Sequence, residues 1–326
     1  MNKKMLLFIV MVAMAIISAA CGSGSNGAQA PAAQTEVPKE AATPAPEELT
    51  IKHKLGEAKL KKNPQKVAVF DYGVLDSLDK LGVEVTSVPQ SSLPSYLEKY
   101  KDSKYVNAGT LFEPDFEKLN DIKPDVIFIS GRAQDKYEEL NKIAPTIFLA
   151  VDTTKYMDSF AANMKTLGEV FGKEKEVETE LAKINDEIKA VHDKAATSGK
   201  ALVVLANEGK ISAYGAGSRF GIIHDVLGFA QSDEKIEAST HGQSVTAEYI
   251  AEKNPDYLFV VDRGAAVKSD KSAPSGKQTI ENDLTKNTNA AKNGHIVYLD
   301  PNYWYLSGGG LISVAEMVNE ISAGIK

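Results

Sequence analysis

The chain has 326 residues, a formal net charge of −7 and a single cysteine. This charge argues against a nucleic-acid partner, because neutralising phosphates requires a basic face and no basic stripe runs along the sequence. One cysteine excludes an internal disulfide, so stability must come from apolar cores, and the length favours two domains of about 100–150 residues each.

Residues 1–20 are typical of a secretion signal. Two lysines precede an apolar stretch over residues 5–17, which is too short for a comfortable membrane span. Small residues then lead to Cys21, a pattern that resembles the bacterial lipobox, in which the cysteine is lipidated and becomes the mature N-terminus. Ser18 departs from that pattern, since the position usually holds an apolar residue. The alternative is an ordinary cleaved signal with a cysteine nearby by chance.

Residues 21–49 contain the cysteine and a segment rich in Ala, Pro, Gly, Ser and Thr. Such a composition buries too little apolar surface to fold, so we expect a flexible tether between the lipidated Cys21 and the body of the protein. No later apolar run approaches the length of a membrane span, and we expect the body to lie outside the bilayer.

Short apolar runs alternate with amphipathic segments over residues 50–152 and again over 173–326. This alternation predicts an α/β protein with two lobes, each containing a mainly parallel sheet. The predicted helices lie near residues 73–82, 133–143, 220–229, 245–253 and 310–325. The predicted strands are 67–70, 126–130, 146–150, 201–206, 257–262 and 296–299.

Residues 153–172 are predicted to form one long helix that links the lobes. Apolar residues recur there at helical spacing from Tyr156 to Val170, and Gly172 provides a stop. A second amphipathic helix is expected from Val177 to Ala195. The alternative is that both helices belong to one large domain.

An internal repeat relates the two lobes. Residues 117–132 match residues 248–263 at a constant offset of 131, with Glu, Pro, Asp and Arg at equivalent positions. Each copy predicts a helix, a Pro-Asp turn, a buried strand and an arginine at the carboxyl end of that strand. We therefore expect two lobes built to one plan.

Three arginines indicate the class of ligand. Of 37 basic residues, only Arg132, Arg219 and Arg263 are arginines, and each is predicted to follow a strand. In open α/β sheets ligands bind outside the carboxyl ends of the strands. Because guanidinium groups donate in a rigid fork and stack on rings, three of them in one cleft suit a compact, multiply negative ligand. The alternative is a set of ordinary ion pairs.

Other candidate ligand contacts are His241, in a polar loop, Tyr72, after the first strand, and the run Tyr303, Trp304 and Tyr305. Imidazole and phenolate are plausible iron(III) ligands, and aromatic walls suit a ligand that contains rings. A solvated loop histidine and a Tyr-Trp-Tyr run in the core are the alternatives.

Six segments together resemble the helical-backbone (class III) substrate-binding proteins of iron-siderophore importers, and most closely the petrobactin- and catecholate-siderophore-binding lipoproteins of bacilli. The resemblance covers essentially residues 50–326. The segments are residues 69–73 (VFDYG), 131–133 (GRA), 214–221 (YGAGSRFG), 240–244 (THGQS), 261–264 (VDRG) and 304–310 (WYLSGGG).

The resemblance implies that Arg132, Arg219 and Arg263 surround a tris-chelated iron core. It also implies that a histidine and a tyrosine complete the iron coordination when the siderophore provides too few donors. His241 matches that histidine, and for the tyrosine Tyr303 is preferred over Tyr305.

The resemblance further implies docking to an ABC permease through one acidic residue on each lobe, Glu117 and Glu248. Ordinary exposed helix glutamates are the alternative. The implied protein is a monomeric, lipid-anchored, extracytoplasmic receptor that works with the permease and its ATPase, has no cofactor of its own and carries an iron(III)-siderophore complex.

Other functions remain open on the sequence alone. The ligand can instead be a citrate- or hydroxamate-type chelate, cobalamin or haem. A binder of free zinc or manganese is disfavoured because the five histidines are dispersed. An extracytoplasmic enzyme is the alternative from another class, although no G-x-S-x-G or H-E-x-x-H motif is present.

Overall fold

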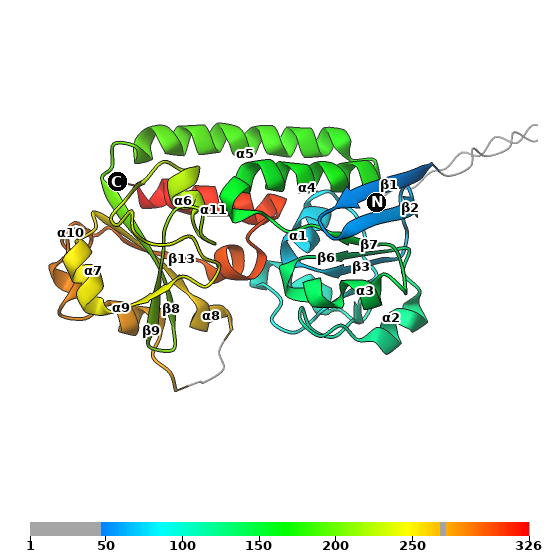
Figure 1. The fold of residues 1–326 in the computed structure, drawn as a ribbon, viewed down its shortest axis with the longest axis horizontal. Helices are drawn as coiled ribbons and strands as arrows, with labels where there is room; N and C mark the ends of the chain where they lie inside the picture. Colours follow the sequence, from blue (N-terminus) through cyan, green and yellow to red (C-terminus); the bar gives the residue numbers. More distant parts are fainter. Residues whose placement is uncertain (1–46, 268–271, 326) are drawn as a thin grey trace, which may run out of the picture. The chain divides into compact units, whose positions relative to one another are not determined.

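The computed structural model describes residues 47–267 and 272–325, all within one compact unit. The predicted secretion signal, Cys21 and most of the predicted tether lie outside the described residues. Two lobes, each with its own sheet, make up the described part (Figure 1). Among its helices, none combines the length and hydropathy that crossing a bilayer requires.

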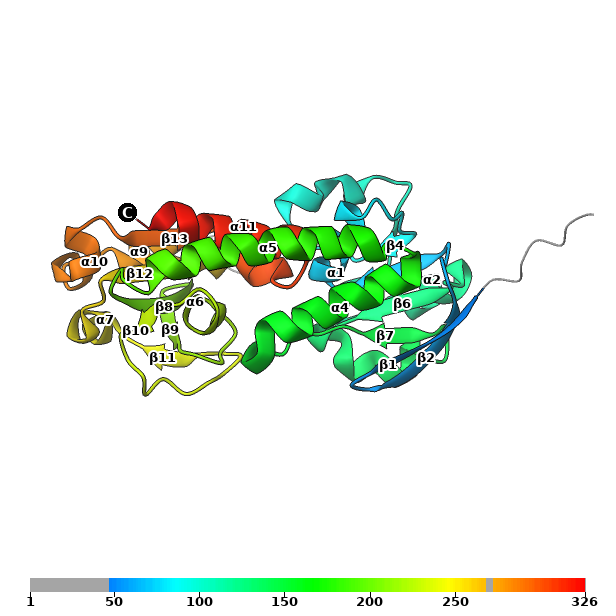
Figure 2. The same cartoon turned by 90° about the horizontal axis from the view of Figure 1, so that it is seen from above.

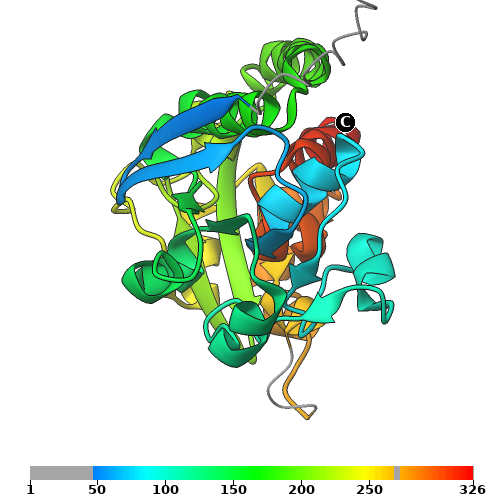
Figure 3. The same cartoon turned by 90° about the vertical axis from the view of Figure 1, so that its right-hand side faces the viewer.

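The first lobe contains a parallel sheet of five strands in the order β5-β4-β3-β6-β7. Its central strands β3 and β6 are buried along their whole length, as expected for a parallel sheet covered on both faces. An antiparallel hairpin, which the sequence did not predict, lies beside this lobe (Figure 3). The bounds are β1 (Glu48–His53), β2 (Gly56–Lys61), β3 (Val67–Phe70), β4 (Ser87–Val88), β5 (Val106–Asn107), β6 (Val126–Ile129) and β7 (Thr146–Phe148).

The second lobe contains six strands in the order β11-β9-β8-β12-β13, with β10 paired to β8. The pairs that β8, β12, β13 and β10 form with one another are parallel, whereas β9 is antiparallel to both of its neighbours. The predicted α/β class with mainly parallel sheets is confirmed. The bounds are β8 (Lys200–Asn207), β9 (Lys210–Tyr214), β10 (Ala230–Gln231), β11 (Gln243–Val245), β12 (Tyr257–Asp262) and β13 (Ile296–Leu299).

Two helices, rather than one, connect the sheets. Helix α4 (Tyr156–Phe171) ends at Gly172, whose φ of +62° terminates the helix, and α5 (Glu174–Ala195) then runs back along α4. The predicted linking helix at 153–172 is thus α4, but the helix that runs along both lobes is α5 (Figures 1 and 2). Helix α11 (Leu311–Gly324) lies beside α5.

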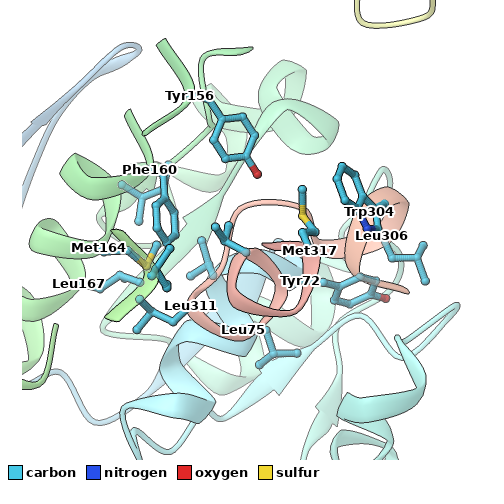
Figure 4. Close-up of a cluster of buried hydrophobic side chains, with 14 of the residues drawn as sticks. Tyr72, Leu75, Tyr156, Phe160, Met164, Leu167, Trp304, Leu306, Leu311 and Met317 are labelled. Atoms are coloured by element: carbon cyan, nitrogen blue, oxygen red, sulfur yellow. The ribbon is translucent and has the colours of Figure 1, made fainter. Parts of the chain in front are cut away.

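One continuous apolar core joins the lobes. It includes Val69 of the first sheet, Val203 of the second, and residues of α1 (Tyr72–Lys80), α4, α5 and α11. Figure 4 shows the part of this core formed by α1, α4, α11 and the segment around Trp304. Because protein interiors are densely packed, this core adds to α5 in fixing one lobe against the other.

The internal repeat corresponds to equivalent structure in both lobes. Helices α2 (Phe116–Ile122) and α7 (Ala247–Lys253) begin after the N-caps Asp115 and Thr246. They end at Lys123 and Asn254, both in the left-handed conformation. Since 115 and 246, and likewise 123 and 254, differ by 131, the sequence offset holds at both ends of the helix.

The Pro-Asp turns of the repeat fasten each lobe in the same way. The Asp125 carboxylate accepts the backbone N–H of Lys66 at 2.8 Å, and Asp256 accepts that of Lys200 at 2.9 Å. Each aspartate therefore joins its own strand to the start of the neighbouring strand, β3 or β8.

The remaining helices are α3 (Tyr137–Leu140), α6 (Ile222–Asp225), α8 (Arg263–Ala266), α9 (Gly276–Ile280) and α10 (Asn289–Lys292).

Candidate functional site

A cavity of about 620 Å³ is lined by residues of both lobes. Its volume is within the range of small-molecule sites. Loops that follow strands supply much of its wall: residues 130–132 come after β6, residues 149–151 come after β7, and Asp71 comes after β3. The second lobe contributes Arg219, Thr240 and His241. In the first lobe the cavity therefore lies at the carboxyl ends of the parallel strands.

The three arginines converge on one residue, Tyr305. Arg132 donates from Nη2 to the Tyr305 carbonyl oxygen at 2.8 Å and from Nη1 to the Leu306 carbonyl oxygen at 3.1 Å. Arg219 donates to the same Tyr305 carbonyl at 2.6 Å, and its guanidinium carbon lies 4.3 Å from the centre of the phenol ring. Arg263 donates from Nε to the Tyr305 hydroxyl at 2.8 Å.

The arginines differ in how they face the cavity. Arg132 and Arg219 line it, whereas Arg263 reaches it through the Tyr305 hydroxyl and also donates to Asn207 at 2.9 Å. In the described residues every ion pair involves a lysine, and none joins an arginine to a carboxylate. No carboxylate in that part of the chain therefore lies within ion-pair distance of the three arginines, although Asp71 and Asp135 line the same cavity.

The electrostatics of the cavity follow from this arrangement. Burial of the Tyr305 phenol opposes its ionisation, but the hydrogen bond from Arg263 and the charges of Arg219 and Arg132 outweigh burial and lower its pKa. Burial, together with the charge of Arg132, lowers the pKa of the Arg219 guanidinium. Both shifts are expected where positive charges gather in a site partly closed to water, because they stabilise a phenolate and disfavour another cation.

Tyr303, the preferred iron ligand of the sequence analysis, is placed elsewhere. Its ring packs against Tyr96, with ring centres 4.8 Å apart, and it does not line the cavity. Burial and the nearby carboxylates of Glu316 and Asp300 raise its pKa. Tyr305, the second choice from the sequence, is the tyrosine that lies among the arginines.

Tyr72 and Trp304 belong to the core rather than to an open aromatic wall. Tyr72 is fully buried, and its hydroxyl donates to the carbonyl oxygens of Ser91 and Pro89, so its prediction as a ligand contact is not supported by its position (Figure 4). Trp304 borders the cavity but is only 2% exposed, and its Nε1 donates to Glu320 at 2.7 Å.

His241 is the exposed imidazole of the cavity wall. Its backbone is fixed, because its N–H donates to Ser239 Oγ and its carbonyl accepts from the Tyr214 hydroxyl. Within the described residues its imidazole makes no hydrogen bond, so both ring nitrogens are available to a ligand.

A π-helical turn, Asn302–Ser307, carries Tyr305 between β13 and α11. Buried Asp76 of α1 holds the start of α11, since its carboxylate accepts the backbone N–H of Ser313 at 3.0 Å. The Tyr96 hydroxyl lies 3.0 Å from Asp76 Oδ2 and 2.6 Å from Ser307 Oγ, which ties the turn to the same carboxylate. A Cβ at Gly310 would lie 1.8 Å from Asp76 Oδ1, so this approach requires glycine.

Among the wall residues that sequence reasoning did not single out are Asp71, Asp135 and Phe112. Asp71 caps α1 by accepting the Val74 N–H at 3.0 Å and also accepts from Ser130. Asp71 directly follows β3, and a position after a strand is also what drew attention to the arginines. The same reasoning could have identified Asp71 from the sequence. Nothing in the sequence distinguishes Phe112 from its buried neighbour Leu111.

Glu117 and Glu248 lie outside the cavity. They are exposed at equivalent positions in the first turns of α2 and α7. A hydrogen bond with the Thr246 side chain lowers the pKa of Glu248.

Known proteins resemble this chain in sequence and in fold. The petrobactin-binding protein YclQ of Bacillus subtilis is 49% identical over the full length of both chains, and its crystal structure superposes with a TM-score of 0.83 over 86% of this chain and 99% of that one. The ferric-anguibactin-binding protein FatB of Vibrio anguillarum is 33% identical over 92% of this chain and 93% of its own. The catecholate-siderophore-binding protein VctP of Vibrio cholerae has a TM-score of 0.81 at 40% identity, over 85% and 100% of the two chains.

These relatives confirm the resemblance that the six sequence segments indicated. The family model described as periplasmic binding protein matches residues 67–303, which include both sheets, α5 and the three arginines. The chain therefore belongs to the periplasmic binding protein family.

Proposed function

We propose that this protein binds a ferric siderophore of the catecholate class, similar to petrobactin, and delivers it to an ABC importer. The ligand occupies the cavity between the lobes, with iron(III) as cargo. The observation that carries the proposal is the convergence of Arg132, Arg219 and Arg263 on Tyr305, with no arginine–carboxylate ion pair among the described residues. A tris-catecholate iron(III) complex has three negative charges, which three guanidinium groups match.

The relatives support the same class of ligand. YclQ is named for petrobactin, VctP is described as a catecholate-siderophore-binding protein and FatB is named for ferric anguibactin. Each is a binding protein, and we propose that this chain likewise binds without chemical turnover.

Tyr305 and His241 complete the iron coordination when the siderophore leaves positions open. The lowered pKa of Tyr305 favours the phenolate, which is the form that binds iron(III). His241 supports this role because it is exposed on the cavity wall and its imidazole makes no hydrogen bond within the described part of the chain. This assignment replaces Tyr303 with Tyr305.

Delivery requires contact with the permease, and we assign this to Glu117 and Glu248. Their exposure at repeat-equivalent positions, one on each lobe, supports simultaneous docking to two related basic pockets. We further propose that Cys21 is lipidated and anchors a monomeric receptor to the outer face of the cell membrane.

The test is a titration of the full chain with a ferric catecholate, followed through the fluorescence of Trp304, the sole tryptophan. Each charge-assisted hydrogen bond contributes about 1.5–3 kcal/mol, so Arg132→Ala and Arg219→Ala are each expected to raise Kd about 10- to 150-fold. Arg219→Lys keeps the charge but loses the stacked fork, and we expect an intermediate loss. Unchanged affinity in both alanine variants, with folding intact by circular dichroism, would contradict the proposal.

A further inference from the structure

Phe112 is an aromatic ring that the fold leaves open to solvent on the wall of the cavity. It is 60% exposed, the largest value among the large hydrophobic residues that the structure describes. Two others, Leu284 at 41% and Tyr298 at 37%, do not line the cavity. Leaving a phenyl ring in water costs free energy that burial on binding a ligand would recover.

A rigid turn holds Phe112 in this position. The Thr110 hydroxyl accepts the backbone N–H groups of Phe112 at 3.2 Å and Glu113 at 2.9 Å. The Thr110 N–H in turn donates to the Glu113 carbonyl at 3.0 Å. Gly109 begins the turn with φ of +99°, and a Cβ there would lie 2.5 Å from the Glu113 carbonyl oxygen.

Two contacts fix the turn to the first lobe. Leu111, next to Phe112, is buried in the core, and Glu113 forms an ion pair with Lys136 at 3.2 Å. The chain thus buries one member of the Leu-Phe pair and presents the other. Phe112 is therefore preorganised, and a ligand that contacts it does not have to order a loop first.

The other aromatic side chains of the cavity leave Phe112 a distinct role. Trp304 and Tyr156 are buried, and the half-buried Tyr305 ring is stacked by Arg219. The arginines contact the charged centre of the proposed ligand, so an exposed ring on the first-lobe wall is available to the arms around that centre.

We propose that Phe112 stacks on an aromatic ring of the ligand and so selects aryl-bearing chelates over iron complexes of similar charge without rings. The inference rests on the proposed function and adds to it a residue that distinguishes chelating arms with aromatic rings from those without. Aromatic pairs prefer offset or edge-to-face contact, and such a pair together with the buried area corresponds to about tenfold in Kd.

The test compares wild type with Phe112→Ala, Phe112→Leu and Phe112→Tyr, using the iron(III) complex of catechol at three catechols per iron and ferric citrate as probes. We expect Phe112→Ala to weaken binding of the catechol complex about tenfold, Phe112→Tyr to retain wild-type affinity and Phe112→Leu to lie between them. Affinity for ferric citrate, weak or strong, is expected to stay the same in all four proteins. Leu284→Ala, which removes an exposed apolar side chain away from the cavity, is the matched control and is expected to bind as wild type.

The melting temperature of the free protein separates recognition from structure. Because the ring is exposed, we expect all three Phe112 variants to have the same melting temperature as the wild type. If the wild type binds the catechol complex and Phe112→Ala binds it with the same affinity, the inference is overturned and the proposed function still stands. Equal affinity of Phe112→Leu and Phe112→Tyr would assign the contact to apolar area rather than to the ring and would also overturn it. Failure of the wild type to bind any ferric catecholate would overturn both proposals.

Discussion

Replacing Tyr305 with phenylalanine removes the hydroxyl that accepts from Arg263 at 2.8 Å and leaves the ring stacked under Arg219. The hydrogen bond from Arg263 lowers the pKa of Tyr305 and so favours the phenolate, and a hydrogen bond to a charged group contributes about 1.5–3 kcal/mol to a complex. An iron chelate with two catechols leaves coordination positions open, and Tyr305→Phe is expected to raise its Kd at least about 10- to 150-fold. A chelate with three catechols already fills the iron coordination, so its Kd is expected to change by less than about tenfold.

The assay is a titration of wild type, Tyr305→Phe and the control Tyr303→Phe with both complexes. The visible charge-transfer band of the two-catechol complex provides a second measurement. Because an added phenolate donor changes this band, we expect the band to shift on binding to wild type and Tyr303→Phe, and to shift less on binding to Tyr305→Phe. Equal losses for both complexes would refute a direct iron contact. A reduced band shift in Tyr303→Phe alone would assign the iron contact to Tyr303.

Three further outcomes are expected. Burial raises the pKa of Asp76 to about 7, above its value in an unfolded chain. The folded protein therefore binds this proton more tightly than the unfolded chain does. Its free energy of unfolding is expected to fall by up to about 4 kcal/mol as the pH rises from about 4 to about 7. Asp76→Asn should reduce the decrease in melting temperature over that pH range, and an unchanged pH dependence in this variant would contradict the role of Asp76. Replacing Glu117 and Glu248 together with alanine should abolish iron uptake by cells without changing ligand affinity, and continued import at the wild-type rate would exclude their docking role. Cys21→Ala should move the protein from the membrane fraction to the medium, and its retention in the membrane fraction would contradict lipid anchoring.

The strands were predicted well where the sequence is uniformly apolar. The strands β3, β12 and β13 have the predicted bounds, and β3 and β6 lack any polar residue because parallel strands are covered on both faces. The hairpin of β1 and β2 was missed because charged residues alternate with its few apolar ones, and its second strand consists largely of residues that favour helices.

The three arginines could be singled out from the sequence because arginine is rare in this chain and because Arg132 and Arg263 follow parallel strands. Which neighbouring aromatic residue joins them was not predictable. Tyr303, Trp304 and Tyr305 lie in one π-helical turn, where successive side chains point in different directions, toward Tyr96, Glu320 and the arginines respectively. A periodicity argument needs regular helix on both sides, and a short π turn does not provide it.

The position of the lobe-spanning helix depended on a single glycine. The sequence correctly indicated a stop at Gly172, but it could not show that the chain turns back there. The reversal places α4 beside α5, so the second helix, rather than the first, extends over both sheets.

The three guanidinium groups, which form no ion pair with a carboxylate of the described residues, have a consequence for how the protein binds its ligand in solution. The whole chain carries a net charge of −7, which repels an approaching anion. At physiological ionic strength the Debye length is about 8 Å, so dissolved salt screens that repulsion over most of the approach. Inside the cavity screening is weaker and the attraction of the arginines dominates. Lowering the salt concentration is therefore expected to slow capture of a trianionic complex while strengthening its retention.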